Sequence, residues 1–460
     1  MNGAGSAWKA ILRRHAHAFG APSFALFCEL VSAWVCATGR RTICGMVAVM
    51  DPASRRAHDA YHRFVRAGAW HPDRLWATII ALAVDHVDPD AVIVCLVDDT
   101  LMHRHGPNVN GAGSYRDAVR STHARIVFAR GLNLVVLCVR VVPPWGAMPI
   151  AIPVGIRLHR KGGAKLPALA AELMTEFASR LPHRRFTLCA DGAYACLAGD
   201  GLPRTTVVSR MRRDAALFGP PPPRTGKRGR PRRRGERLPT PPELAAGARR
   251  FKRLDIDWRG RTETRLVWSR PVLWYGVCPT AMVRLVVVRD PAGREPDDFF
   301  FTTDLDMGPA LVVSVYAGRW AIEITYRDVK QHAHGQEPQT WKGNGPERAV
   351  TLAFWLHAAV WLSYLDTSGL TPTFTTQPWY TAKHAPSFAD ALTELRKALW
   401  RDRITPTSPD GQLSPEMTTV LVEALEDVAF AVELGGGPRC HGLTRVKQPG
   451  TRWLLLQPSW

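Results

Sequence analysis

The chain has no stretch of 18 consecutive apolar residues and no visible cleavable signal, so we expect neither a membrane-spanning nor an exported protein. Its nine cysteines are scattered, and none forms a C-x2-C pair. Several of them lie inside apolar runs. We therefore expect reduced core residues of a cytoplasmic protein, with neither a zinc site nor a disulfide framework.

Acidic residues are fewer than basic ones. Forty Asp and Glu residues face sixty Lys and Arg residues, which gives a net charge of +20 over 460 residues. Such an excess predicts a polyanionic partner, and nucleic acid is the first choice. A hydrophobic content of 46% belongs to a folded protein, and the length is sufficient for two to three domains.

Two apolar runs end in acids. Residues 91–97 form a continuous apolar segment that ends in Asp98 and Asp99, and residues 186–190 form another that ends in Asp191. Continuous apolar runs are typical of strands buried on both faces. A carboxylate at the end of such a strand is costly unless its charge has a use, so these acids are candidate metal ligands.

A third acid lies on a predicted helix. Tyr316, Arg319, Glu323 and Lys330 are offset by 3, 4 and 7 residues, which places them within an arc of roughly 60° on one helix. An ordinary amphipathic helix with a solvated charged face can give a similar pattern. Here, however, the polar residues lie beside the apolar stripe of the same helix rather than opposite it.

Together these motifs resemble those of bacterial insertion-sequence transposases of the DDE class, in the group defined by the Y-x2-R-x3-E-x6-K signature. All four signature residues have the right spacing, and the Asp-Asp-Thr and Asp-Gly-Ala-Tyr strings precede them in the expected order. An Arg/Pro-rich string between Asp191 and Glu323 is also typical. The resemblance extends from about residue 30 to about residue 370.

The resemblance implies an RNase H-like catalytic core in which Asp99, Asp191 and Glu323 bind two Mg²⁺ ions, for which Mn²⁺ could substitute. Asp98 competes with Asp99 for the first position, because strand alternation cannot decide between adjacent residues at a strand end. The same resemblance implies contacts to the phosphates of the cleaved DNA end. The residues that would make them are Tyr316, Arg319 and Lys330.

The first ninety residues are predicted to be helical. A helix from Pro22 to Ala37, a glycine turn and a basic segment from Arg40 to Met50 have the outline of a helix-turn-helix DNA reader. Arg40 and Arg41 would contact phosphates. A small helical bundle with a charged exterior is the alternative for this region.

An insertion is expected between the second strand-end acid and the glutamate helix. Its first part is rich in Pro, Gly and basic residues, and Lys227, Arg228 and Arg230 form a string similar to an AT-hook. A solvated basic linker is the alternative, and either version would bind phosphate. The second part is predicted to be a small β-rich domain.

The overall prediction is an α/β protein with an RNase H-like mixed-sheet core interrupted by a β-rich insertion, and with helical terminal regions. The predicted divisions are 1–90 (DNA-binding), 91–210 (first part of the core), 211–305 (linker and insertion), 306–370 (second part of the core) and 371–460 (helical).

The implied function is cutting of DNA at the terminal inverted repeats of an element, followed by joining of the 3′ ends to target DNA by metal-assisted phosphoryl transfer. The implied partner is double-stranded DNA, bound by a homodimer on paired ends, with no membrane, in the bacterial cytoplasm at the nucleoid. The alternatives are an RNase H-like nuclease without strand transfer and a non-catalytic DNA-binding protein derived from a transposase.

Overall fold

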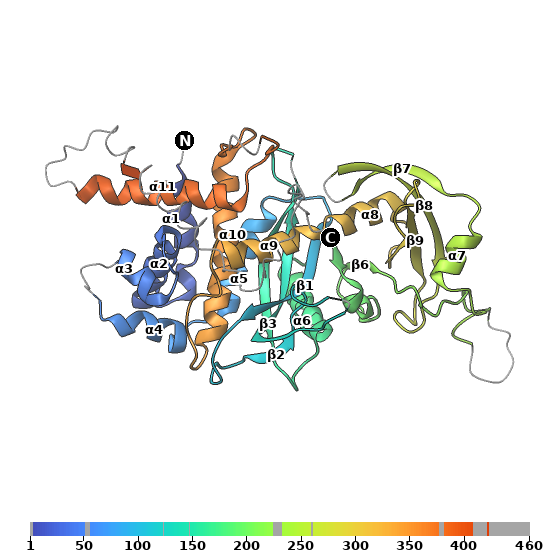
Figure 1. Cartoon of the computed structure of the whole chain (residues 1–460), viewed down its shortest axis with the longest axis horizontal. Coiled ribbons are helices and arrows are strands. Elements are labelled where there is room, and N and C mark those ends of the chain that lie inside the picture. The colour runs from blue at the N-terminus through green and yellow to red at the C-terminus, as the bar shows by residue number, and fades with distance from the viewer. Residues whose placement is uncertain are drawn as a thin grey trace, which may run out of the picture.

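A mixed ten-stranded sheet runs through the centre of the protein, and helices cover it (Figure 1). The structure is a computed structural model that describes residues 3–50, 56–122, 124–146, 148–223, 232–258, 261–376, 381–407 and 421–422. The strands are β1 Ile93–His103, β2 Gly113–Arg116, β3 Phe128–Val141, β4 Ile150–His159, β5 Phe186–Ala190, β6 Thr205–Arg210, β7 Lys252–Trp258, β8 Arg261–Val272, β9 Val283–Arg289 and β10 Asp298–Thr302.

Helices lie on the faces of the sheet and form a bundle at its end. They are α1 Ala4–Arg14, α2 Ala21–Cys36, α3 Ile43–Met50, α4 His58–Ala67, α5 Pro72–Val84, α6 Leu166–Arg180, α7 Pro241–Gly247, α8 Pro309–Ala317, α9 Trp320–Gln331, α10 Gly345–Ser368 and α11 Phe388–Thr407. Two 3-10 segments, η1 Ala16–Ala18 and η2 Gly192–Gly199, complete the described elements.

The first half of the sheet has an RNase H-like arrangement, as predicted. β1 pairs antiparallel with β3 and parallel with β5, while β4 pairs antiparallel with β3 and β6 pairs parallel with β5. The run of Val, Ile and Leu in β1 is buried on both faces, which explains its continuous apolar sequence. Three antiparallel strands, helix α6 and two parallel strands thus form the predicted RNase H-like core.

The strands of the predicted β-rich insertion continue the central sheet. β10 pairs antiparallel with β6, and the sheet then continues through β9, β8 and β7. This pairing covers the edge of β6, and the side chains of Phe300 and Phe301 in β10 are buried. The insertion therefore extends the central sheet, at the right of Figure 1.

The N-terminal helices pack against the C-terminal ones. The Trp34 indole donates a hydrogen bond to the Ala333 carbonyl, and the Arg396 guanidinium of α11 donates to the Val35 carbonyl of α2. Helices α1, α4 and α5 contact α10, which stands between this bundle and the sheet (Figure 1). The two ends of the described chain thus form one helical bundle.

Among the described helices, α10 is the one long and apolar enough to be tested as a membrane span. By length and composition alone it passes that test, but 94% of its apolar window is buried inside the protein. Its side chains pack against α1, α5, α11 and β4. Burial on all sides explains its apolar sequence as that of a core helix.

The predicted single helix from Tyr316 to Lys330 is two helices. α8 ends at Ala317 and α9 begins at Trp320, with Gly318 and Arg319 between them. At this junction the Arg319, Ala321 and Ile322 amides bond to carbonyls three residues back. A glycine weakens the helix here, and the tighter i→i+3 bonds interrupt the α-helical ladder.

Candidate active site

Two acids come together where β1 lies beside β5. Val97 pairs with Ala190 in the parallel register, so Asp98 and Asp191 are the next residues on adjacent strands. Neighbouring strands lie about 4.8 Å apart, and residues at the same level of parallel strands point to the same face. Asp191 also begins η2, where its carboxylate accepts a hydrogen bond from the Ala193 amide at 2.7 Å.

Glu323 reaches this face through a shared arginine. The Arg319 guanidinium donates to the Asp98 carboxylate at 2.9 Å and to the Glu323 carboxylate at 2.7 Å. One planar group therefore spans the two acids, which come from β1 and α9. The Tyr326 hydroxyl of α9 donates to the main-chain carbonyl of Asp98 at 2.9 Å and holds the helix on the strand.

Negative charge is concentrated around Asp98. Burial raises its pKa to about 7; Arg319 opposes the increase, and the charges of Asp191 and Asp99 add to it. The side chain of Asp98 is 18% exposed and that of Glu323 33% exposed. A cation that approached this site from solvent would be stabilised by carboxylates that Arg319 alone does not neutralise.

Asp99 faces the opposite side of the sheet from Asp98, because side chains alternate along a strand. Its carboxylate accepts a hydrogen bond from the Tyr194 hydroxyl at 3.0 Å, and the Asn133 amide lies within reach in its alternative orientation. Burial raises the pKa of Asp99, these two hydrogen bonds lower it, and Asp191 raises it. The sequence pattern did not indicate that Tyr194 and Asn133 hold Asp99.

The remaining signature residues do not form one cluster. The Tyr316 ring lies under the Arg319 guanidinium at 5.6 Å and against Phe300 at 4.5 Å, and burial raises its pKa to about 12 despite Arg319. Lys330 lies on α9 about two turns after Glu323. Burial lowers the pKa of Lys330, and the charge of Asp117 opposes the decrease.

The structure separates the predicted DNA-binding residues of the terminal region. Arg40 is exposed before α3. Arg41 is only 1% exposed, and the Glu337 carboxylate accepts a hydrogen bond from its main-chain amide. This buried position contradicts the expectation that the Arg41 side chain contacts phosphate. Lys227, Arg228 and Arg230 lie outside the described residues.

The donor set at this site fits hard divalent cations. Asp98, Asp191 and Glu323 offer only carboxylate oxygens, which Mg²⁺ and Mn²⁺ prefer. In the part of the chain that the structure describes, their oxygens do not all lie within 4.8 Å of one another. Arg319 lies between two of them, so binding ions jointly requires its guanidinium to move aside.

A family model for the DDE superfamily endonucleases matches residues 24–265, which is more than half of the chain. No curated protein matches the sequence. The matched segment contains Asp98, Asp99 and Asp191 and ends before Glu323, which the Arg319 bridge brings to the same site. The chain thus belongs to the DDE superfamily endonucleases, nuclease-type enzymes that act on DNA with divalent metal ions.

Proposed function

We propose that this protein is a transposase that cuts DNA at the terminal inverted repeats of an element and joins the freed 3′ ends to target DNA. The observation that carries the proposal is the Arg319 bridge between Asp98 and Glu323, beside Asp191. The proposal is supported by this contact between acids distant in sequence and by the strand register that puts Asp191 next to Asp98. A DNA-binding module without catalysis has no use for such a concentration of buried negative charge.

In this proposal Asp98, Asp191 and Glu323 hold two Mg²⁺ ions, and Asp98 replaces Asp99 as the first ligand. The register with β5 and the contact with Arg319 both favour Asp98, while the hydrogen bond to Tyr194 directs Asp99 elsewhere. When bound, such ions activate a water for in-line attack on a phosphodiester and offset charge on the departing 3′ oxygen.

The neighbouring cations would position the DNA. Arg319 would exchange its carboxylate partners for a phosphate at the cut, where its planar fork can bond two oxygens. Lys330 would neutralise a phosphate further along the strand, and the Tyr316 hydroxyl would donate a hydrogen bond. The net charge of +20 supports a long DNA contact, to which Arg40 and the basic residues Lys227, Arg228 and Arg230 would contribute.

A nicking assay tests the chemistry. The substrate is a duplex that carries matched inverted repeats from the DNA flanking the gene. We expect Asp191→Asn and Glu323→Gln to bind this duplex as the wild type does and to lose Mg²⁺-dependent nicking by on the order of 10³-fold, because each removes a charged ligand. Undiminished nicking by either variant would remove that residue from the mechanism.

Strand transfer distinguishes a transposase from a nuclease of the same fold. A duplex with a pre-cut 3′ end is incubated with the wild-type protein, Mg²⁺ and plasmid target, and joined products are counted. We expect joined products from the wild type and none from Glu323→Gln. Nicking without any joined product would indicate a nuclease, and binding without nicking would indicate a DNA-binding protein.

A further inference from the structure

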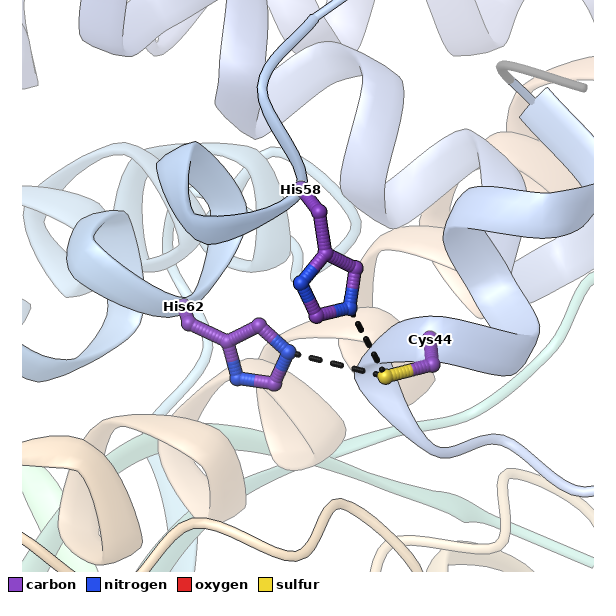
Figure 2. Close-up of side chains that lie close together, drawn as sticks. All are labelled: Cys44, His58 and His62. Carbon is purple, nitrogen blue, oxygen red and sulfur yellow. Dashed lines mark hydrogen bonds between the residues drawn. The ribbon is translucent and has the colours of Figure 1, made fainter. Parts of the chain in front are cut away.

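A second cluster of ligand-type side chains lies far from the acids, on the helical bundle. Cys44 of α3 faces His58 and His62, which are one turn apart on α4 (Figure 2). Cys44 and His58 are exposed and His62 is half-buried. The three residues are outside the acid site and have no role in the proposed reaction.

The two imidazoles point the same nitrogen at one sulfur. His58 Nε2 lies 3.2 Å from Cys44 Sγ, and His62 Nε2 lies 3.6 Å from it. With Zn–S near 2.3 Å and Zn–N near 2.0–2.1 Å, a tetrahedral zinc site places a ligating sulfur and nitrogen about 3.6 Å apart. Both sulfur–nitrogen separations are therefore close to what one tetrahedral ion requires, and the three ligand atoms all lie within 4.8 Å of one another.

Hydrogen bonding can link the three groups only through weak sulfur contacts. A thiol carries a single proton, so Cys44 can donate to one of the two nitrogens, and the other can reach the sulfur only as an N–H donor to a weak acceptor. The histidines also have the i, i+4 spacing that places two side chains on one helical face. A metal ion would satisfy the thiolate and both nitrogens at once.

We propose that Cys44, His58 and His62 bind one Zn²⁺ ion, with a water at the fourth position. A thiolate with two imidazoles is a soft to borderline donor set that selects zinc over Mg²⁺. Binding requires neutral imidazoles, and burial lowers the pKa of His62, with help from His58 and Arg66. The ion would fasten α3 to α4 at the surface of the bundle.

The amino-acid sequence does not indicate this cluster, because the spacing of its ligands follows no zinc motif. Its single cysteine precedes the two histidines by 14 and 18 residues, without a C-x2-C pair. The expectation that all cysteines are core residues also does not hold, because Cys44 and Cys196 are exposed. Only the packing of α3 on α4 brings the three ligands together.

Cobalt substitution tests the proposal on the full-length protein. The purified chain is stripped of metal, titrated with Co²⁺ in excess Mg²⁺, and followed by absorption spectroscopy. We expect about one Co²⁺ per chain, with a thiolate-to-cobalt charge-transfer band and intense visible bands typical of tetrahedral geometry. The excess Mg²⁺ occupies the carboxylate site, which lacks sulfur and cannot give the thiolate band.

Matched variants make the outcome decisive. Cys44→Ser should abolish the thiolate band, and His58→Ala or His62→Ala should weaken metal binding by more than roughly tenfold. Cys196→Ser and His17→Ala alter an exposed cysteine and an exposed histidine elsewhere and should change neither. Absence of the band from the wild type, or its persistence in Cys44→Ser, would overturn the proposal and leave a thiol–imidazole hydrogen bond.

Discussion

At the scale of single residues, Asp98 combines burial with two further acids. Its neighbours Asp99 and Asp191 raise its pKa, and Arg319 is the cation bonded to it. Asp99, one residue further along β1, is instead held by Tyr194. Adjacent and chemically identical side chains therefore have different environments, because they point to opposite faces of the sheet.

Replacing Asp98 and Asp99 one at a time by asparagine tests which of the two binds the metal. We expect Asp98→Asn to lower Mg²⁺-dependent nicking by on the order of 10³-fold, since an uncharged amide is a poor ligand for a hard cation. Asp99→Asn should lower it by less than about tenfold, because an amide oxygen can still accept the Tyr194 hydrogen bond. The measurement is the single-turnover nicking rate; the reverse order of effects would return Asp99 to the metal site.

Asp98, Asp99 and Asp191 were recognisable in the sequence because each follows an apolar run typical of a buried strand, although β1 does not end at the first two and continues to His103. Choosing between Asp98 and Asp99 was not possible, since it depends on the register of β1 with β5. The same limit applies to Arg319. Its spacing from Glu323 indicated a contact, but its ion pair with Asp98 joins residues 221 positions apart.

At the scale of elements, α9 carries Glu323 to the sheet and Arg319 holds it there. The guanidinium is 13% exposed and connects the start of α9 to the middle of β1. Because it lies between carboxylates that would also bind cations, it competes with them for the same charge. We infer that Arg319 leaves Asp98 and Glu323 when ions and DNA bind.

Removing the positive charge of Arg319 should change Mg²⁺ affinity and the nicking rate in opposite directions. We expect Arg319→Gln to bind Mg²⁺ more tightly by roughly tenfold, because a competing positive charge is lost. The same variant should nick DNA more slowly by on the order of 10²-fold, because a phosphate loses its partner. Mg²⁺ titration followed by thermal stability gives the affinity, and the nicking rate at saturating Mg²⁺ gives the catalytic effect.

Arg327→Gln is the matched control on the same helix. Arg327 is exposed and pairs with the adjacent Asp328, away from the acids. This variant should leave both quantities near the wild-type values. An Arg319→Gln protein with unchanged Mg²⁺ affinity would show that the guanidinium does not compete with the ions.

Element types were largely predictable, whereas their association was not. β5 has the bounds predicted from its apolar run, and β1 includes most of the predicted run at residues 91–97. The continuation of the sheet from β6 into β10 depends on strand pairing across an insertion, which no local pattern encodes. The break between α8 and α9 was also not predictable, because the spacing of Tyr316, Arg319, Glu323 and Lys330 is that of one continuous helix.

At the scale of the whole molecule, the terminal regions share one hydrophobic core with the sheet. His15, which follows α1, is fully buried against α10, where its Nε2 accepts a hydrogen bond from the Trp355 indole at 2.9 Å. Its Nδ1 bonds the Ile11 carbonyl at 2.8 Å. The bond from Trp355 requires an unprotonated Nε2 and therefore a neutral imidazole with its proton on Nδ1, and burial lowers the pKa of His15 to about 4.

This buried histidine should make the bundle sensitive to acid. Below pH 6.5 the unfolded chain binds a proton at His15 that the folded chain does not bind until about pH 4, so stability is lost as the pH falls through this window. The contribution is about 3 kcal/mol. Urea unfolding at pH 7 and pH 4 should show that His15→Gln removes this part of the pH dependence. His17→Gln, which changes an exposed histidine, should retain the pH dependence of the wild type. Equal pH dependence in the wild type and both variants would contradict the role of His15.

The most direct test of the acid site is anomalous diffraction from crystals of the protein grown with Mn²⁺ and a cut DNA end. We expect two Mn²⁺ peaks bound by the carboxylates of Asp98, Asp191 and Glu323, with Arg319 turned away from Asp98 toward a DNA phosphate. Peaks that these three acids do not share, or Mn²⁺ bound by Asp99 while Asp98 stays paired with Arg319, would contradict the proposed site.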